Sequence, residues 1–288
     1  MFNQLHQDYI ETLLQKIEEA DAIIVGGAAG MSTASGYNWY RTDEIFLKHF
    51  GEFAEKYSIE NIFYGFYYRF PTREERWAYI ATLIKFVYDS KIGQTYLDLL
   101  QLLQNKDYFI VTTNQDAQFS KTFPEEKVSS IQGDWRYFQC SGPCHDQVYS
   151  NKEQIEEMYA NIEGTAIPEE LIPTWPTCGG DMEPWVRSRV FLEGSFFRNE
   201  ISKLQAYIMN NKYKKLLFLE LGVGTMTPMF IKEPFQEMTY SLPGAYYISI
   251  NPQDAMVPGE IEEKGIAINE DIAHVFQDAL REKKIVRT

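Results

Sequence analysis

The chain has 288 residues, a formal net charge of −14 at pH 7 and three cysteines. This acidity argues against nucleic acid as the main partner, because contact with phosphate groups needs a basic face. A set of three cysteines cannot pair completely into disulfide bonds, which indicates a reducing compartment. No stretch approaches the roughly 20 apolar residues of a membrane helix, and the N-terminus lacks the basic and apolar regions of a signal peptide. We therefore expect a cytoplasmic protein with no membrane partner.

Hydrophobic periodicity predicts helices and strands in alternation. Apolar residues at helical spacing between Ile10 and Ile17 precede a short buried strand, Ala22–Val25. Further helices are expected at 94–103, 201–210 and 272–280, and further strands at 108–112, 215–221 and 246–250. In the helix at 94–103, Leu97, Leu100 and Leu103 are expected to lie on one face. The alternation predicts an α/β fold, a Rossmann-like doubly wound parallel sheet covered on both faces.

Two longer stretches interrupt this alternation. Residues 46–89 are rich in aromatic side chains, which more often form a core than a binding site. Residues 135–189 are rich in loops and contain all three cysteines. We interpret the second stretch as a small excursion from the main sheet.

The first predicted strand runs into a loop of small residues: Gly26, Gly27, Ala28, Ala29 and Gly30. Small residues allow a sharp turn and a close approach of a ligand to the backbone. A strand followed by such a loop and a helix is typical of phosphate binding in doubly wound sheets. A tight turn without a ligand is the alternative interpretation.

The strand at 108–112 is followed by Asn114 and Asp116. Open parallel sheets bind their ligands at the carboxyl ends of the strands, so these two polar side chains are candidates for a site. The same N-x-D pattern could also cap a turn.

Four stretches occur in the order of the sirtuin motifs. Gly30-Met31-Ser32-Thr33-Ala34-Ser35-Gly36, with Tyr40-Arg41, resembles the first dinucleotide motif, and Thr113-Asn114-Gln115-Asp116 resembles T-Q-N-I-D. Gln132-Gly133 stands at the His-Gly position, and Cys178-Gly179-Gly180 followed by Pro184 resembles the end of the zinc module. The chain therefore resembles the sirtuin family, and most closely its macrodomain-linked (class M) microbial members.

This resemblance implies a single sirtuin domain over residues 1–288. The Rossmann-like core would comprise residues 1–41, 93–134 and 190–288. A smaller module, helical and similar to a zinc ribbon, would be formed by the inserts 42–92 and 135–189.

The resemblance also implies a binding site for NAD. Asn114, Asp116 and Gln132 would be the catalytic residues. The residues implied to bind the cofactor are Gly27, Ala28, Ala29, Gly30, Ser32, Tyr40, Arg41, Thr113, Gly222, Gly224, Thr225, Asn251 and Ile272.

Gln132 is the departure that bears most on function. In a sirtuin deacylase the histidine at this position acts as a general base, whereas an amide has no useful pKa near neutrality. The four histidines of the chain, His6, His49, His145 and His274, all stand outside the site motifs. We therefore expect an ADP-ribosyltransferase with little or no deacylase activity. The alternatives are an inactive module that binds NAD or ADP-ribose, and a residual lysine deacylase.

The class M resemblance implies a protein acceptor. It implies mono-ADP-ribosylation of a lipoylated carrier similar to the glycine-cleavage H protein, reversed by a macrodomain hydrolase. Arg187 and Arg189 follow the last cysteine, and they are candidates for contact with a carrier carboxylate or with the pyrophosphate of NAD. A solvated surface position is the alternative for both.

Cys140, Cys144 and Cys178 occupy positions where sirtuins bind a structural zinc ion, and Trp175 replaces the remaining cysteine. A closed tetrahedral zinc site needs four ligands, and His145 beside Cys144 is a candidate for the fourth. The alternative is a ribbon that has lost its metal. It would then be held together by Trp135, Tyr137, Trp175 and Trp185.

Overall fold

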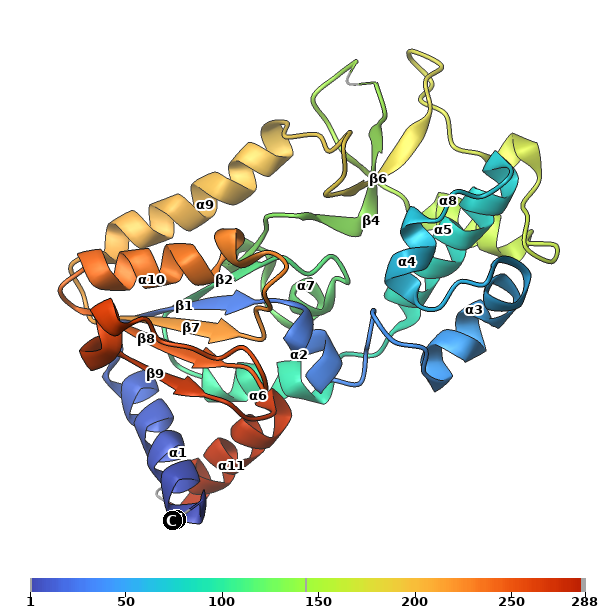
Figure 1. The fold of residues 1–288 in the computed structure, drawn as a ribbon. Coiled ribbons are helices and arrows are strands. Elements are labelled where there is room, and N and C mark those ends of the chain that lie inside the picture. Colours follow the sequence, from blue (N-terminus) through green and yellow to red (C-terminus); the bar gives the residue numbers. More distant parts are fainter. Residues whose placement is uncertain (1, 143, 286–288) are drawn as a thin grey trace.

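The computed structural model describes residues 2–142 and 144–285. Its centre is a six-stranded parallel sheet in the order β3-β2-β1-β7-β8-β9 (Figure 1). The strands are β1 (Ala22–Gly27), β2 (Tyr108–Thr112), β3 (Val128–Ser130), β7 (Leu216–Leu221), β8 (Ala245–Ile250) and β9 (Gly265–Ile268). The predicted fold class is confirmed.

Helices cover both faces of this sheet. One face carries α1 (Phe2–Glu19), α6 (Gln94–Leu102) and α11 (Ile272–Ile285), and the other carries α9 (Ser195–Asn211) and α10 (Lys232–Ser241) (Figure 1). Successive side chains of a strand point to opposite faces of the sheet. Ile23 and Val25 therefore pack in the core under α1, α6 and α11, and Ile24 packs in the core under α9 and α10. Burial on both faces explains why these strands are continuous apolar runs.

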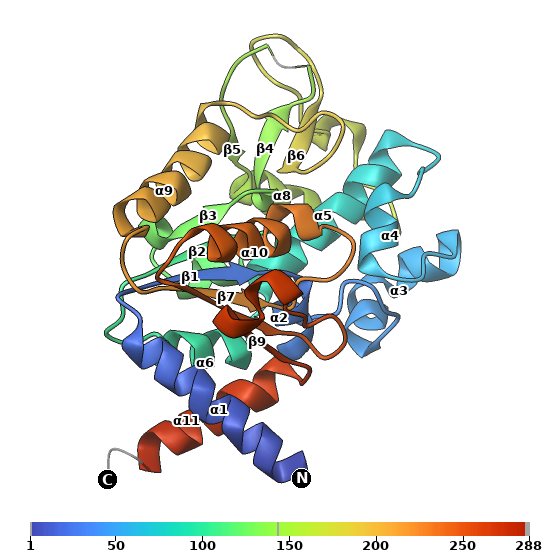
Figure 2. The ribbon, with the colours of Figure 1, turned by 60° about the vertical axis from the view of Figure 1, so that its left-hand side comes forward.

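A smaller module stands beside the carboxyl ends of β1 and β7 (Figures 1 and 2). Its antiparallel sheet has the order β5-β4-β6. The strands are β4 (Gly133–Cys140), β5 (Tyr149–Ser150) and β6 (Met182–Val186), and the helices are α3 (Glu44–Tyr57), α4 (Ile62–Tyr67), α5 (Arg73–Asp89) and α8 (Lys152–Ala160). The aromatic stretch forms a core here, as predicted, because Phe46, Phe50 and Tyr79 are completely buried.

Short elements complete the fold. They are α2 (Ala29–Ala34), α7 (Gln118–Thr122), η1 (Glu125–Lys127), η2 (Glu169–Leu171), η3 (Pro228–Phe230) and η4 (Gly259–Lys264). None of the described helices combines the length and the apolar character that crossing a membrane would require. The division of the chain into a core and a module at the predicted bounds stays a prediction.

The face of α6 that carries the three leucines is buried only in part. In α6, Leu97 and Leu100 are 39% and 36% exposed, whereas Tyr96, Leu99 and Leu103 are completely buried. Apolar residues occur on both sides of this helix, so the spacing of three residues fits two faces equally well. Packing against α11 and α2 selects the face that contains Tyr96.

Candidate active site

The loop after β2 meets the beginning of α2 in a buried hydrogen-bond network. The Asn114 side chain donates from Nδ2 to the carbonyl oxygen of Ala28 (2.9 Å) and to Oγ of Ser32 (3.1 Å). Asp116 accepts from Oγ of Ser32 (2.5 Å) and from the backbone N–H of Gln118 (3.2 Å). Asn114 therefore joins two distant segments, whereas Asp116 both caps a turn and belongs to the network.

Tyr96 completes this network, and sequence reasoning missed it. Its hydroxyl group lies 3.2 Å from Oγ of Ser32 and accepts from Nδ2 of Asn114 at 3.3 Å. Complete burial raises the pKa of Tyr96 well above its usual value, so the hydroxyl stays protonated. A buried tyrosine needs a hydrogen-bond partner. A tyrosine among the leucines of a core helix was therefore the signal that could have identified this residue.

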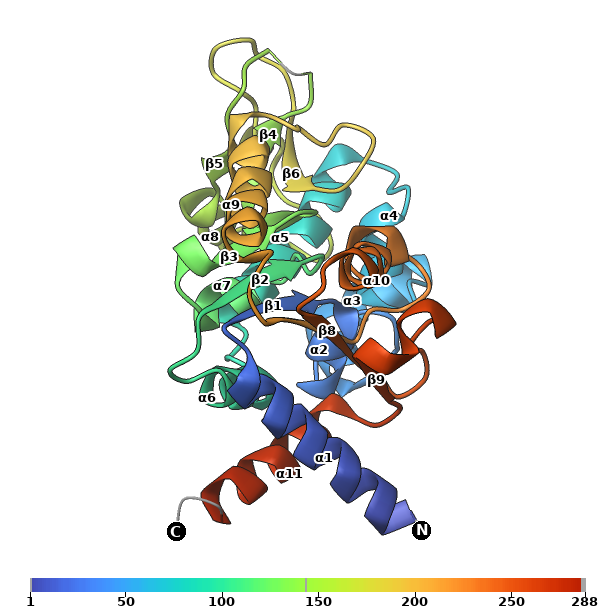
Figure 3. The ribbon, with the colours of Figure 1, turned by 90° about the vertical axis from the view of Figure 1, so that its left-hand side faces the viewer.

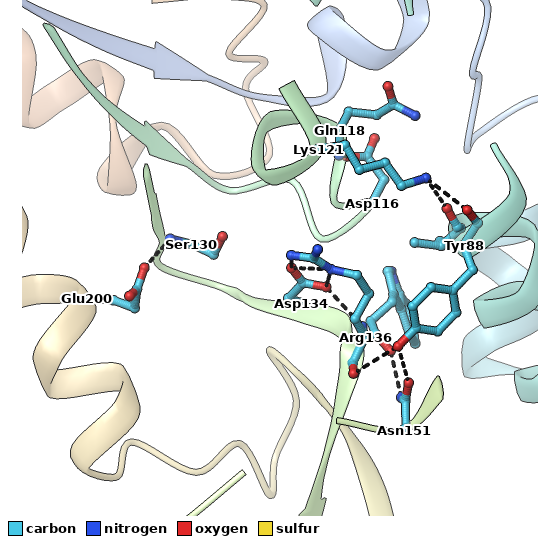
Figure 4. Close-up of polar contacts among 11 residues, drawn as sticks. Tyr88, Asp116, Gln118, Lys121, Ser130, Asp134, Arg136, Asn151 and Glu200 are labelled. Carbon is cyan, nitrogen blue, oxygen red and sulfur yellow. Dashed lines mark hydrogen bonds and ion pairs between the residues drawn. The ribbon is translucent and has the colours of Figure 1, made fainter. Parts of the chain in front are cut away.

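Asp116 lies deep in the protein beside a second polar cluster (Figure 4). Burial raises the pKa of Asp116, and the hydrogen bonds from Ser32 and Gln118 oppose this change. In the second cluster, Asp134 pairs with the guanidinium of Arg136 at 2.6 Å. Lys121 donates to the carbonyl oxygens at the end of α5, including that of Ser90 (2.9 Å). These contacts tie the segment that follows Asp116 to the smaller module.

The two glycine loops pack directly against each other. The N–H of Gly30 donates to the carbonyl oxygen of Gly222 (3.1 Å), and the N–H of Ala28 donates to that of Leu221 (3.0 Å). Gly222 has φ +66°, and a Cβ atom on Gly30 would lie 2.5 Å from Cα of Gly222. The N–H groups of Ala28 and Gly30 thus bond to protein carbonyls, because β1 and β7 are neighbouring strands whose loops meet directly.

The remaining residues implied to bind the cofactor fall into four groups. Gly27 and Ile272 are packed in the protein core, where the absent side chain of Gly27 makes room for the ring of Phe119. Thr113 extends the Asn114 loop, and its N–H donates to Gly27 (3.2 Å). Residues near the surface or on it are Ala29, Tyr40, Arg41, Gly224 and Thr225. Asn251 stands at the end of β8, where its side chain donates to the carbonyl oxygen of Val223 (3.2 Å).

Gln132 and Arg187 are neighbours, and each has an unused donor. The carbonyl oxygen of Gln132 accepts from the N–H of Arg187 (2.9 Å). Within the described part of the chain, Nε2 of Gln132 and Nε of Arg187 are buried and have no hydrogen-bond partner. The guanidinium of Arg187 also lies over the ring of Phe191 (4.1 Å) and pairs with Glu193 (2.6 Å). Arg189 is exposed and separate from this pair.

The three cysteines come together at the tip of the module. Sγ of Cys140 lies 3.6 Å from Sγ of Cys144 and 3.6 Å from that of Cys178. Zinc with Zn–S bonds of about 2.3 Å separates two thiolates by about 3.8 Å, so three corners of a tetrahedron fit. Over residues 2–142 and 144–285, the compact group of metal-ligating side chains at this tip contains these cysteines alone. His145 lies outside it, with Nδ1 3.0 Å from Sγ of Cys144 and its ring stacked on Trp175.

No family model matches the chain. A protein ADP-ribosyltransferase of Staphylococcus aureus strain Mu50 is 35% identical over 275 residues, which cover 94% of this chain and 87% of the relative. The chain belongs to the family of protein ADP-ribosyltransferases. A probable bifunctional ADP-ribose hydrolase/ADP-ribosyltransferase of Fusarium oxysporum f. sp. cubense is 28% identical. That alignment covers 87% of this chain and 44% of the relative.

Solved sirtuin structures share the fold of this ADP-ribosyltransferase. One structure from work on sirtuin substrate affinity has a TM-score of 0.60 and 16% identity, covering 94% of this chain and 98% of its own. A complex of a Sir2 homologue with NAD has a TM-score of 0.58 and 15% identity, covering 96% and 95%. At such identities the likeness shows the sirtuin fold. The family membership rests on the bacterial relative, and it confirms the predicted enzyme class.

Proposed function

We propose that this ADP-ribosyltransferase transfers ADP-ribose from NAD to a side chain of a protein acceptor, with little or no deacylase activity. The observation that carries the proposal is Gln132, an amide where a deacylase needs a base. The described histidines lie on α1, α3 and α11 and beside Cys144, away from the network of Asn114 and Asp116. The site therefore keeps the groups that hold a ribose and lacks the group that would resolve an acyl intermediate.

In the proposed transfer, the bond between nicotinamide and C1′ of the ribose breaks, and nicotinamide leaves as a neutral molecule. A bond from the acceptor side chain to C1′ forms, and the acceptor releases its proton to water. Positive charge develops on the ribose during this exchange, so a carboxylate nearby stabilises the transition state. Asp116 supplies that carboxylate, and Asn114 positions it through Ser32. The unused Nε2 of Gln132 can donate to a ribose hydroxyl, which holds the ribose without removing a proton.

The proposed acceptor is a lipoylated carrier similar to the glycine-cleavage H protein. The guanidinium of Arg187 pairs with the exposed carboxylate of Glu193, and a carboxylate of that carrier can replace Glu193 as its partner. The hydrolase activity in the name of the fungal relative supports a macrodomain hydrolase that reverses the modification. We place this exchange in the cytoplasm.

A module that binds NAD or ADP-ribose without catalysis is the second candidate. It is favoured by the way Asn114 and Ser32 already satisfy each other within the protein. This candidate predicts that NAD binds and that no nicotinamide is released, even when an acceptor is present.

The test is to incubate the purified protein with NAD and either a lipoylated carrier or an acetylated peptide, and to measure intact masses. We expect the carrier to gain one ADP-ribose and the peptide to keep its acetyl group. Asn114→Ala should abolish labelling, whereas Asn161→Ala, at the end of α8, should leave it unchanged. Loss of acetyl from the peptide would contradict the role of Gln132. Intact NAD with both substrates would favour the binding module.

For the cysteine cluster we propose a structural zinc ion held by Cys140, Cys144 and Cys178. Its fourth ligand would be a group other than a described side chain. Metal analysis of the purified protein tests this proposal. About one zinc per chain would support it, and a metal-free protein would favour the ribbon packed around Trp175.

A further inference from the structure

A carboxylate lies inside the central sheet, in the run Leu-Leu-Phe-Leu-Glu-Leu of β7. Glu220 is completely buried among these apolar neighbours. Its Oε2 accepts from the hydroxyl of Tyr247 (2.6 Å) and from that of Ser249 (2.7 Å). Its Oε1 accepts from the backbone N–H of Val223 (3.0 Å). The carboxylate therefore holds a backbone amide of the Gly222–Thr225 loop in place.

Lys232, at the beginning of α10, is the partner of this carboxylate. It is 6% exposed, and its Nζ lies 3.7 Å from Oε2 of Glu220. The same Nζ donates to the carbonyl oxygen of Asp254 at 2.6 Å. One buried ion pair thus connects the Gly222–Thr225 loop to the Asn251–Asp254 turn, at the ends of two adjacent strands.

Stability alone does not explain this pair. Apolar side chains of similar volume often replace a buried ion pair with no loss of stability, or with a gain. The other residues of β7 show that the strand accepts apolar side chains. What an apolar pair could not supply is an acceptor for the N–H of Val223 and a donor to the carbonyl of Asp254.

We infer that Glu220 and Lys232 are positioning residues, which hold the Gly222–Thr225 loop and the Asn251–Asp254 turn in the geometry that binds NAD. This inference rests on the proposed function. It assigns the pair to the affinity for NAD and not to the transfer step, because both residues are buried behind the loops.

Two substitutions at Glu220 of similar volume separate the loss of the hydrogen bond from the loss of the charge. Glu220→Leu leaves the N–H of Val223 without an acceptor, and we expect the Kd for NAD to rise about tenfold. Glu220→Gln keeps an oxygen for that N–H, and we expect the Kd to stay within about threefold of wild type. The kcat at saturating NAD should change less than about threefold in either variant.

A double variant separates positioning from folding. Glu220→Leu with Lys232→Met removes both charges, so thermal stability should recover relative to Glu220→Leu alone. The Kd for NAD should stay raised, because the loop and the turn remain unanchored. Leu219→Ala is the matched control: it opens a cavity in the same strand and lowers the melting temperature, but it should leave the Kd unchanged.

Calorimetry with NAD and with ADP-ribose gives these constants without an acceptor protein. A raised Kd in Glu220→Leu and in the double variant, with a normal Kd in Glu220→Gln and Leu219→Ala, would support the inference. A normal Kd in Glu220→Leu, or a Kd that recovers together with stability in the double variant, would overturn the inference alone. Absence of NAD binding by the wild-type protein would overturn the proposed function as well.

Discussion

Tyr96 contributes its hydroxyl group to the network that holds Asn114 and Ser32. Tyr96→Phe removes that group and keeps the ring, so the packing of α6 should survive. The loss of one hydrogen-bonded group should weaken the stabilisation of the transition state by about 1 to 1.5 kcal/mol. This change corresponds to about a tenfold fall in kcat/KM for transfer. Steady-state kinetics with the acceptor protein would measure it.

Tyr57→Phe is the control for the loss of a buried hydroxyl. Tyr57 bonds to Thr165 at 3.0 Å in the smaller module. Its substitution should lower stability slightly and leave kcat/KM unchanged. Equal kinetics in the two variants would show that Tyr96 has no part in the site.

The residues of the site differ in how far the sequence alone predicts their positions. Asn114 and Asp116 follow a plain apolar strand, so their place at the sheet edge could be predicted. Tyr96 lies on a helix preceding that strand, and its contact with Ser32 depends on which face of α6 is buried. The spacing of the leucines fits either face, so the tertiary packing decided this point.

At the scale of elements, the two glycine loops at the ends of β1 and β7 depend on each other. Gly30→Ala would place a Cβ atom 2.5 Å from Cα of Gly222, where only backbone can move. We expect a loss of about 2 to 3 kcal/mol from overpacking, seen as a fall in melting temperature of about 5 to 10 °C. Thermal denaturation followed by circular dichroism would measure it.

Gly51→Ala is the matched control. Gly51 lies within α3, and a Cβ atom there would meet no neighbour within 4 Å. Alanine favours a helix over glycine by about 0.5 to 1 kcal/mol, so this variant should be as stable as wild type or more stable. Equal destabilisation of both variants would contradict the close contact between the loops.

Local sequence patterns predict the helices and strands themselves. They do not predict which acceptors the N–H groups of the loops bond to. Apolar runs predicted β1, β2, β7 and β8, because strands buried on two faces have little room for polar residues. The N–H groups of Ala28 and Gly30 bond to the carbonyl oxygens of Leu221 and Gly222, which lie nearly 200 residues further along the chain. A glycine motif read alone therefore indicates a close approach of backbone, without saying whether a ligand or another loop approaches.

At the scale of the whole molecule, His6 ties the first helix to the last part of the chain. Nδ1 lies 2.7 Å from a carboxylate oxygen of Glu270, and Nε2 lies 3.0 Å from one of Asp278. The hydrogen bond to Glu270, followed by the contact with Asp278, raises the pKa of His6 above 6.5, although partial desolvation opposes it. This contribution to stability is fully present below the unfolded-state pKa and is lost as the pH rises through the folded-state value.

His6→Gln should therefore lower the melting temperature more at pH 5.5 to 6, about or below the unfolded-state pKa, than at pH about 8.5. His274→Gln, an exposed histidine on α11, controls for the change in composition. Melting temperatures of the wild type and both variants, measured across this pH range, would check the predicted pH dependence. A difference from wild type that is the same at both pH values would contradict the role of the ion pairs.

Helices α1 and α11 cross on the side of the molecule that faces away from the smaller module, and both ends of the described chain lie there (Figure 3). The loops with Asn114, Gln132 and Gly222 lie where the strands of the main sheet end, next to the smaller module. Enzyme tethered to a sensor chip or to beads through either end would turn its site toward the solution. A bulky protein substrate could then reach the immobilised enzyme as freely as a dissolved one.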